Sequence, residues 1–389
     1  MGKKEKKLTP KIRFKGFTDD WEHCKLGDVS EIITGGTPST DVPEYWDGEI
    51  NWYSPNEIGD KMYVFESARK ITCEGYRRCS AQLLPADKTI LFTSRAGIGN
   101  MAILKKEACT NQGFQSIVTK DLVDTHFIYF MGNLIKREAI RLASGSTFLE
   151  ISNKEMHEIE ICIPTKNEQI KISEIFRQLE KTITLHQKKI EKLEELKKAY
   201  LQQLFPKKGE KTPKLRLANF REFWKECKLE DLLEYFSSKY TLADINIGEG
   251  KYPIYDANSV AGYINTYDME KKYISIIKDG AGVGRLDLKE RYSSILATMG
   301  YLVPFEEDNI YFIYYFLKTI NFEKYITGTT IPHIYFKDYK LEKCFLPGKD
   351  EIIYIGNLLA LMDTLIESNK YKLIQFQNVK QLYLQNMFV

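Results

Sequence analysis

No stretch of the 389 residues approaches the roughly 18 consecutive uncharged apolar residues of a membrane span, so we expect no transmembrane helix and no membrane partner. Basic residues follow Met1, but no apolar segment comes after them, which predicts the absence of a secretory signal. The seven cysteines form no Cys-x-x-Cys pair. This argues against a zinc finger or a disulfide scaffold and favours reduced thiols in a cytoplasmic protein. The net charge of +3 neither requires nor excludes a nucleic-acid partner.

Motifs for catalysis are absent as well. The sequence has no Gly-x-x-x-x-Gly-Lys-Ser/Thr phosphate loop, no Asn-Pro-Pro-Tyr signature of amino-methyltransferases and no glycine spacing typical of dinucleotide binding. None of the five histidines pairs with acids or cysteines at the spacing of a metal site or a catalytic triad; they are His23, His126, His157, His186 and His333. We therefore predict no catalytic residue, no metal and no cofactor on this chain. An acid–base site among the many carboxylates stays an open alternative.

What the sequence does contain is a duplication. The segment from Pro10 to Asp28 matches the segment from Pro213 to Asp231 at an offset of 203 residues. Later, the segment 145–205 matches the segment 328–388 at an offset of 183 residues, without a gap. The middle of the second copy is therefore shorter by 20 residues. The chain consists of a shared beginning, a variable middle and a shared end, twice over.

Each copy ends in a predicted long helix. Apolar or large residues recur there in alternating steps of four and three, the heptad pattern of a helix that packs along its whole length. The residues expected to pack are Ile172, Leu179, Ile183, Ile190, Tyr200, Ile355, Met362, Ile366, Leu373 and Tyr383. Polar residues interrupt both patterns at equivalent places, His186 with Asn369 and Lys197 with Lys380. They either fix the register of the helices or extend to solvent from a wider groove.

The fold class that follows is α+β: two domains in tandem, separated by two long antiparallel helices that form a coiled-coil spacer, with a pseudo-two-fold internal repeat. The predicted boundaries are 1–164 for the first domain, 165–206 for the first helix, 207–347 for the second domain and 348–389 for the second helix. The variable middles contain short β-rich runs such as 89–93 and 273–277, each followed by glycine turns. A short helix is expected at 125–143 and at 309–320.

Several polar residues in the two copies suit contact with DNA. Small hydroxyls and exposed backbone amides let a phosphate approach closely, arginine pairs with guanine, and asparagine or glutamine pairs with adenine. In the first copy the candidates are Thr34, Gly35, Gly36, Thr37, Ser39, Thr93, Ser94, Arg95, Asn111, Gln112, Ser146 and Thr147. In the second copy they are Asn258, Ser259, Lys278, Arg285, Thr329, Thr330 and His333. For each, an ordinary turn or a structural ion pair stays an open alternative.

Further segments follow one another in a characteristic order. In the first copy they are Trp21 to Asp28, Gly35 to Ser39, Tyr45 to Trp52, Leu91 to Gly99 and Asn111 to Phe114. In the second copy they are Tyr252 to Asn258, Asp279 to Gly284 and Gly328 to Ile334. This order, together with the duplication, resembles the specificity (S) subunit of type I restriction-modification enzymes over the full length of the chain and in both copies.

The resemblance implies that each variable middle is a target-recognition domain that reads one half of an asymmetric, bipartite site on double-stranded DNA. The helices would set the spacer between the half-sites and dock two methylation subunits, and two restriction subunits would complete the complex. The chain would be a non-catalytic subunit of an adenine-specific methyltransferase and ATP-dependent endonuclease. S-adenosylmethionine, ATP and Mg would belong to the partner subunits. Two rival classes stay open: a protein-binding adaptor with duplicated domains, and an enzyme with an unrecognised site.

Overall fold

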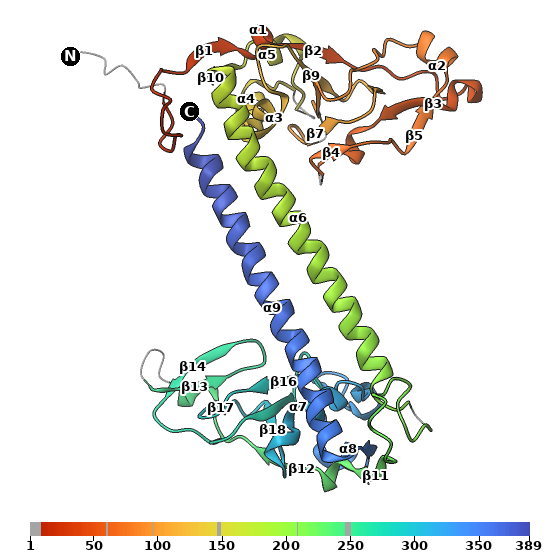
Figure 1. Ribbon diagram of the computed structural model, residues 1–389, viewed down its shortest axis with the longest axis vertical. Coiled ribbons are helices and arrows are strands. Elements are labelled where there is room, and N and C mark those ends of the chain that lie inside the picture. The colour runs from red at the N-terminus through yellow and green to blue at the C-terminus, as the bar shows by residue number, and fades with distance from the viewer. Residues whose placement is uncertain (1–8, 60, 96, 146–148, 208, 246–249) are drawn as a thin grey trace, which may run out of the picture. The chain divides into compact units, whose positions relative to one another are not determined.

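The computed structural model describes residues 9–59, 61–95, 97–145, 149–207, 209–245 and 250–389 (Figure 1). The chain forms two compact units, Met1–Leu185 with Leu373–Val389 and His186–Lys372. Both long helices, α6 (Lys166–Gln203) and α9 (Lys349–Asn386), are divided between these units. The compact units thus divide within each helix, whereas the sequence places a domain boundary at the helix ends. Those sequence boundaries remain predictions.

The first unit contains two mixed sheets and a separate strand pair. The larger sheet has the strand order β2-β9-β6-β7-β4 and the smaller one β5-β3-β8, while β1 pairs with β10. Their bounds are β1 (Glu22–Lys25), β2 (Ser30–Thr34), β3 (Trp46–Tyr53), β4 (Tyr63–Val64), β5 (Arg69–Ile71), β6 (Thr89–Phe92), β7 (Met101–Leu104), β8 (Ala108–Thr110), β9 (Gln115–Thr119) and β10 (Glu160–Ile163). The predicted strand 89–93 is confirmed as β6, whose residues are all buried: Ile90 and Phe92 cluster with side chains of α3 (Thr125–Phe130) and α4 (Gly132–Leu142), and Leu91 clusters with side chains of the smaller sheet.

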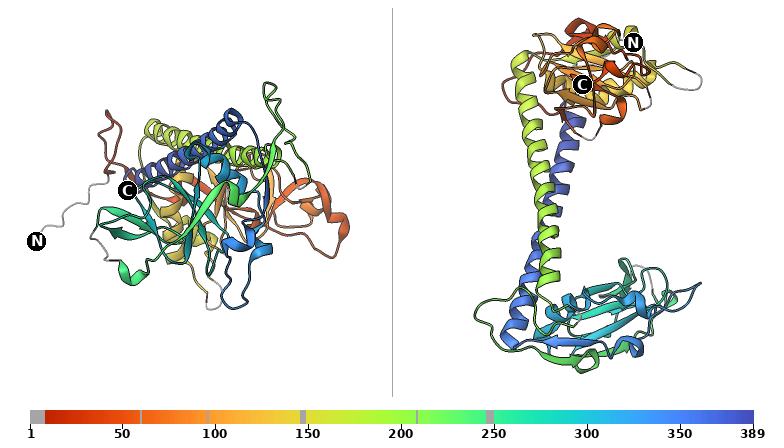
Figure 2. Two further views of the ribbon diagram at one scale, coloured as in Figure 1. Left: turned by 90° about the horizontal axis from the view of Figure 1, so that it is seen from below. Right: turned by 90° about the vertical axis from the view of Figure 1, so that its right-hand side faces the viewer.

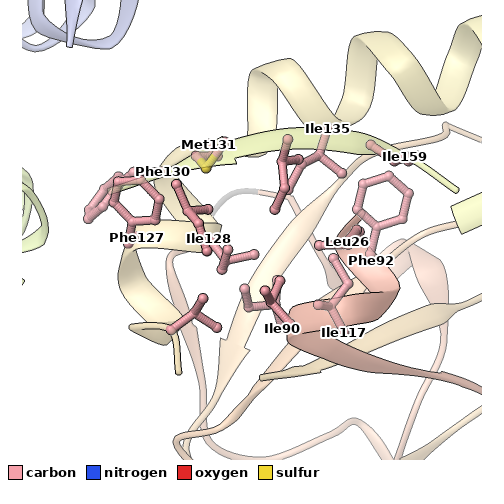
Figure 3. Close-up of a cluster of buried hydrophobic side chains, with 14 of the residues drawn as sticks. Leu26, Ile90, Phe92, Ile117, Phe127, Ile128, Phe130, Met131, Ile135 and Ile159 are labelled. Carbon is pink, nitrogen blue, oxygen red and sulfur yellow. The ribbon is translucent and has the colours of Figure 1, made fainter. Parts of the chain in front are cut away.

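Short helices complete the core of the first unit. They are α1 (Leu26–Val29), α2 (Cys73–Arg77), α3 (Thr125–Phe130), α4 (Gly132–Leu142) and α5 (Asn153–His157). The predicted helix 125–143 is therefore two helices that meet at Met131, and it begins where Asp124 Oδ1 accepts the Phe127 N–H at 2.9 Å. Figure 3 shows side chains of α3 and α4 packed over those of β6 and β9, with Phe127 and Ile135 fully buried.

The second unit repeats this plan with different lengths. The order β12-β18-β15-β16 matches β2-β9-β6-β7, a small sheet has the order β14-β13-β17, and β11 pairs with β19 as β1 pairs with β10. The strand bounds are β11 (Lys225–Lys228), β12 (Leu233–Ser237), β13 (Tyr252–Tyr255), β14 (Val260–Ile264), β15 (Tyr273–Ile277), β16 (Leu286–Lys289), β17 (Ser294–Ile295), β18 (Met299–Pro304) and β19 (Lys343–Leu346). The short helices are α7 (Ile310–Leu317) and α8 (Phe336–Tyr339). The predicted strand 273–277 and the predicted helix within 309–320 are confirmed.

Each long helix ends in the core of the other repeat. Phe388, just after α9, packs in the first unit against Phe127 and Phe176, with ring centroids 5.4 and 5.7 Å apart. Phe205, just after α6, packs in the second unit against Phe312, with ring centroids 5.3 Å apart. Figure 2 shows the last turns of α9 beside the globular part of the first unit. No described helix is long and apolar enough to cross a membrane.

The helix residues expected to pack are buried to different degrees. Fully buried side chains are Ile172, Ile183, Ile190, Ile355, Met362 and Ile366, and half-buried ones are Leu179, Tyr200, Leu373 and Tyr383. None of these ten side chains is exposed, so the heptad pattern corresponds to a packed face on both helices.

The polar interruptions contact the opposite helix rather than solvent alone. His186 Nδ1 lies 3.1 Å from Asn369 Oδ1, and these two residues are equivalent in the repeat. Lys197 forms an ion pair with Asp363 in the second unit, and its equivalent Lys380 forms one with Glu180, the equivalent of Asp363, in the first. Contacts that recur under exchange of the repeats favour the register interpretation of these residues, because a slipped helix pair would break all three.

Each long helix starts at a buried ion pair. Glu168, in the first turn of α6, accepts hydrogen bonds from Arg13 Nε and Nη2 at 2.7 and 2.8 Å. Glu351, in the first turn of α9, accepts two bonds of 2.7 Å from Arg216, and Trp224 Nε1 donates to the same carboxylate at 3.2 Å. The bond to the carboxylate raises the pKa of each arginine, so both guanidinium groups stay charged.

Replacing Arg216 with methionine should destabilise the second unit by about 3 kcal/mol, because it leaves a buried carboxylate without its counter-charge. Urea denaturation of the full chain, followed by circular dichroism, measures the change. Combining Arg216→Met with Glu351→Gln should recover part of the loss. Lys343→Met, which breaks the exposed pair with Glu226, serves as the control and should change nothing measurable. Equal effects of the two single variants would contradict the role of burial.

Candidate nucleic-acid interface

The first-copy candidates converge on one loop cluster at the ends of β2, β6 and β8. The loop after β2 is tied to the end of β8, since the Gly36 N–H donates to the Thr110 carbonyl at 2.8 Å. Thr37 Oγ1 hydrogen-bonds Gln112 Oε1 in the neighbouring loop, and Ser39 is exposed at the edge. The polar residues therefore come together although some seventy positions separate them.

Strand β2 joins the same cluster through its last residue. Thr34 Oγ1 donates to Gln115 Oε1 at 2.8 Å across the β2–β9 pair. The Thr34 side chain is exposed in part, so it lies between the sheet and the loop that follows. This bond fixes the direction in which the loop leaves the sheet.

Two tryptophans of β3 hydrogen-bond the backbone of the loop after β2. They were not among the residues that the sequence predicted for the site. Trp52 Nε1 donates to the Gly36 carbonyl at 2.8 Å, and Trp46 Nε1 donates to the Ser39 carbonyl at 3.0 Å. The Arg69 guanidinium lies 3.6 Å from the centroid of the Trp46 ring. Because the indole donors satisfy carbonyls at both ends of the loop, its shape depends on the strand β3 beneath it.

Glycine is required in this loop by close packing. A Cβ atom on Gly35 would lie 2.2 Å from the carbonyl oxygens of Thr110 and Asn111, and one on Gly36 would lie 2.5 Å from the Ala81 nitrogen. Neither glycine has a positive φ angle, so the constraint is space rather than backbone conformation. Both glycines are buried and therefore shape the loop from within.

Arg95 lies beside the Asn111–Gly113 loop. Its Nε would be 3.4 Å from a Cβ atom placed on Gly113, whose N–H donates to Asn111 Oδ1 at 2.9 Å. Arg95, Asn111 and Gln112 are half-buried or exposed. The arginine and the two amides that suit base recognition are therefore neighbours with access to solvent.

Thr93 and Ser94 support this loop from inside. Thr93 Oγ1 donates to the Gly97 carbonyl at 2.7 Å, and both hydroxyls are buried. Because both side chains are buried, the prediction that they contact DNA directly does not fit the structure. The Ser94 carbonyl accepts the Ile151 N–H at 3.1 Å. The neighbouring residue Glu150 forms an isolated antiparallel β-bridge with Ser144, so this bridge also lies next to the loop cluster. The candidates 146 and 147 lie outside the described residues.

The second unit builds its candidate site on the same backbone frame. The Lys278 carbonyl accepts the Ile334 N–H at 2.9 Å, as the Ser94 carbonyl accepts that of Ile151. Thr327 and His333 exchange two backbone hydrogen bonds of 2.9 and 2.8 Å, as Ser144 and Glu150 do in the first unit. Thr329 and Thr330 lie exposed within the loop that this bridge closes, and His333 is half-buried.

The side chains on this frame differ between the units. In the second unit Asp279 follows Lys278, whereas Arg95 follows Ser94 in the first. The candidate arginine of the second unit is Arg285, which follows the glycine turn, and its Nη2 lies 3.4 Å from Asn258 Oδ1. Asn258 and Ser259 are exposed in the turn between β13 and β14. Two sites of one construction thus present different hydrogen-bonding groups.

No group of three or more His, Cys, Asp or Glu within the described ranges could hold a metal ion. Under the first site, burial raises the pKa of Tyr53 to about 12, so that its phenol is neutral over the physiological range.

These sites can be compared with known proteins. The sequence pattern of the family "Type I restriction modification DNA specificity domain" matches residues 18–195 and 221–375, one match per repeat. The chain belongs to this family. A specificity subunit of the type I restriction enzyme MjaIX of Methanocaldococcus jannaschii is 36% identical over 184 residues, 46% of this chain and 42% of that protein. The EcoprrI specificity subunit of Escherichia coli is 24% identical over 89% of this chain and 88% of its own length.

The chain spans less than half the length of several curated family members that it matches, 42%, 41% and 32% of them. Among solved structures, the S subunit of a type I restriction-modification system from M. genitalium covers 98% of this chain and 99% of its own, with a TM-score of 0.68 at 19% identity. The tandem α+β fold with its long helices is therefore the fold of this family.

Replacing Trp52 with phenylalanine should cost about 1–3 kcal/mol of stability, because it leaves the buried Gly36 carbonyl without its donor. Hydrogen exchange of the full chain should become faster at residues 35–39. Tyr53→Phe is the matched control: within the described residues the Tyr53 hydroxyl is buried without a hydrogen-bond partner, so its loss should cost nothing. Unchanged exchange in Trp52→Phe would show that the indole does not hold the loop.

Proposed function

We propose that this chain is the DNA-recognition subunit of a type I restriction-modification complex, in which each globular domain reads one half of an asymmetric bipartite site. The observation that carries the proposal is the pair of loop clusters built on one backbone frame with different side chains. A repeated frame provides two equivalent approaches to DNA, and the changed side chains make the two half-sites different in sequence.

The exposed groups on each frame are those that direct readout uses. Arg95 with Asn111 and Gln112 in the first unit, and Arg285 with Asn258 in the second, are suited to pair with guanine and adenine edges. The backbone amides and hydroxyls of Thr37, Ser39, Thr329 and Thr330 are suited to position phosphates. With a net charge of only +3, the chain depends on other subunits for much of the phosphate attraction.

The proposed partners are two methylation subunits that dock on the long helices and two restriction subunits. S-adenosylmethionine, Mg and ATP are assigned to these partners, which would carry out adenine methylation and DNA cleavage. The chain itself contributes recognition and spacing. Its proposed location is the cytoplasm, where such a complex meets DNA.

The experiment that tests this function is expression of the chain with its own methylation subunit in a host free of DNA methylation, followed by sequencing of modified adenines. We expect one split motif with a fixed unread gap, methylated on both strands. An intact complex that leaves the genome unmethylated would overturn the proposal and favour the adaptor alternative.

Arg95→Ala should relax the first half of the motif and leave the second half unchanged, and Arg285→Ala should do the reverse. Loss of one bidentate pair to guanine costs about 1–3 kcal/mol, roughly a 5- to 150-fold loss of discrimination at that base pair. The same methylation mapping measures both. Each variant is the control for the other, and a change in both halves from one variant would refute independent reading.

The spacing role of the helices gives a separate test. Adding about four residues to each of α6 and α9 lengthens each by about 6 Å. At about 3.4 Å per base pair, the unread gap should widen by one or two base pairs while both half-sites stay the same. An unchanged gap in an active variant would refute the role of the helices as the spacer.

A further inference from the structure

Two cysteines of the second unit face each other on neighbouring strands. In the antiparallel pair of β11 with β19, Cys227 lies directly opposite Cys344, and their Sγ atoms are 3.0 Å apart. Directly opposed residues of antiparallel strands have Cα atoms about 4.5–5.5 Å apart, which lies within the range of disulfides. A bond between the two sulfurs therefore needs only a small movement of side chains.

The first unit has the same strand pair without this arrangement. Cys24 is the equivalent of Cys227, but Ile161 lies opposite it, and Cys162 lies opposite His23. The facing pair is thus a property of the second repeat alone. The repeat also supplies a natural reference in which the same position is occupied by isoleucine.

The two thiols differ in access and in acidity. Cys227 is half-buried, whereas Cys344 is only 1% exposed. The hydrogen bond with Cys344 lowers the pKa of Cys227, and the same contact together with burial raises the pKa of Cys344. Cys227 is therefore the thiol that a reagent reaches first and the better nucleophile of the two.

We propose that Cys227 and Cys344 form a reversible disulfide by exchange with a small-molecule disulfide of the glutathione type. The Cys227 thiolate attacks one sulfur of the reagent, its S–S bond breaks, and one small thiolate leaves. Cys344 then loses its proton and attacks the Cys227 sulfur of the mixed disulfide, and the second small thiolate leaves. The two protein thiols are oxidised, and the reagent is reduced to two thiols.

The cross-link would join the first strand of the second unit to its last strand. β11 follows Trp224, and β19 ends at Leu346, just before α9 begins at Lys349. The bond would close the loop between residues 117 positions apart, which strongly restricts the unfolded chain. Oxidation therefore stabilises the second unit and leaves the first unit as it was.

The test is treatment of the reduced full chain with oxidised glutathione, followed by intact-mass measurement and peptide mapping under denaturing conditions. We expect a chain lighter by two hydrogens, with the peptides of Cys227 and Cys344 linked, and full reversal by dithiothreitol. Hydrogen exchange of the two native forms should slow in the second unit only. A glutathione adduct that stays on Cys227, or reaction confined to the exposed Cys73, would overturn the proposal.

Variants at the two facing positions, in both repeats, provide the controls. Cys344→Ile should keep a single glutathione adduct on Cys227 and form no cross-link. Cys227→Ser should form neither the adduct nor the cross-link. Because this second variant changes the more accessible thiol, it tests the proposal even if Cys344→Ile folds poorly. Ile161→Cys places a thiol opposite Cys24 and should produce the same cross-link in the first unit. If that variant stays uncross-linked while the wild-type pair reacts, the reaction depends on more than strand register, and the geometric argument is wrong.

Discussion

A buried carboxylate in the first turn of each long helix determines how that helix leaves its globular part. Glu168 and Glu351 each accept hydrogen bonds from the Nε and Nη2 atoms of an arginine, which lies in a segment that precedes the first strand of the repeat. Because a bidentate pair fixes orientation as well as distance, the start of the helix is tied to the entry of the domain. In each repeat, the loop cluster of the candidate site lies in the sequence between this arginine and this glutamate.

The C-terminal end of each long helix packs in the core of the repeat that does not contain its N-terminal end. Phe205 and Phe388 are equivalent residues, and each packs among aromatic rings of the opposite repeat. Each core therefore includes a phenylalanine that the other sequence repeat contributes. The paired contacts of His186 with Asn369, and of the two lysines, keep the helices in the register that brings these ends into place.

The sequence predicted those parts of the architecture that depend on the internal repeat and on the heptad period. The two offsets predicted a duplicated α+β unit, and the heptads predicted the long helices. The exchange of ends was not predictable, because a heptad pattern shows that a face is buried but does not identify what covers it. For the site, residue type selected Arg95 and Gln112, which the structure leaves accessible to solvent, but it also selected Thr93 and Ser94, which belong to a continuous buried run. Trp46 and Trp52 were missed as site residues because a tryptophan in an apolar strand is typical of a core, and the sequence does not show that their indoles donate to backbone carbonyls of the preceding loop.

The backbone bonds that frame the two sites have a consequence for how such a protein diversifies. The bonds of Ile151 to Ser94 and of Ile334 to Lys278 use only main-chain atoms, so they persist whatever side chains stand beside them. Substitutions at neighbouring exposed positions can accumulate without a matching change elsewhere in the fold. If each half of the molecule reads its own half-site, as proposed, the number of bipartite DNA sites that such a protein can come to recognise is the product of the possibilities in the two halves, not their sum.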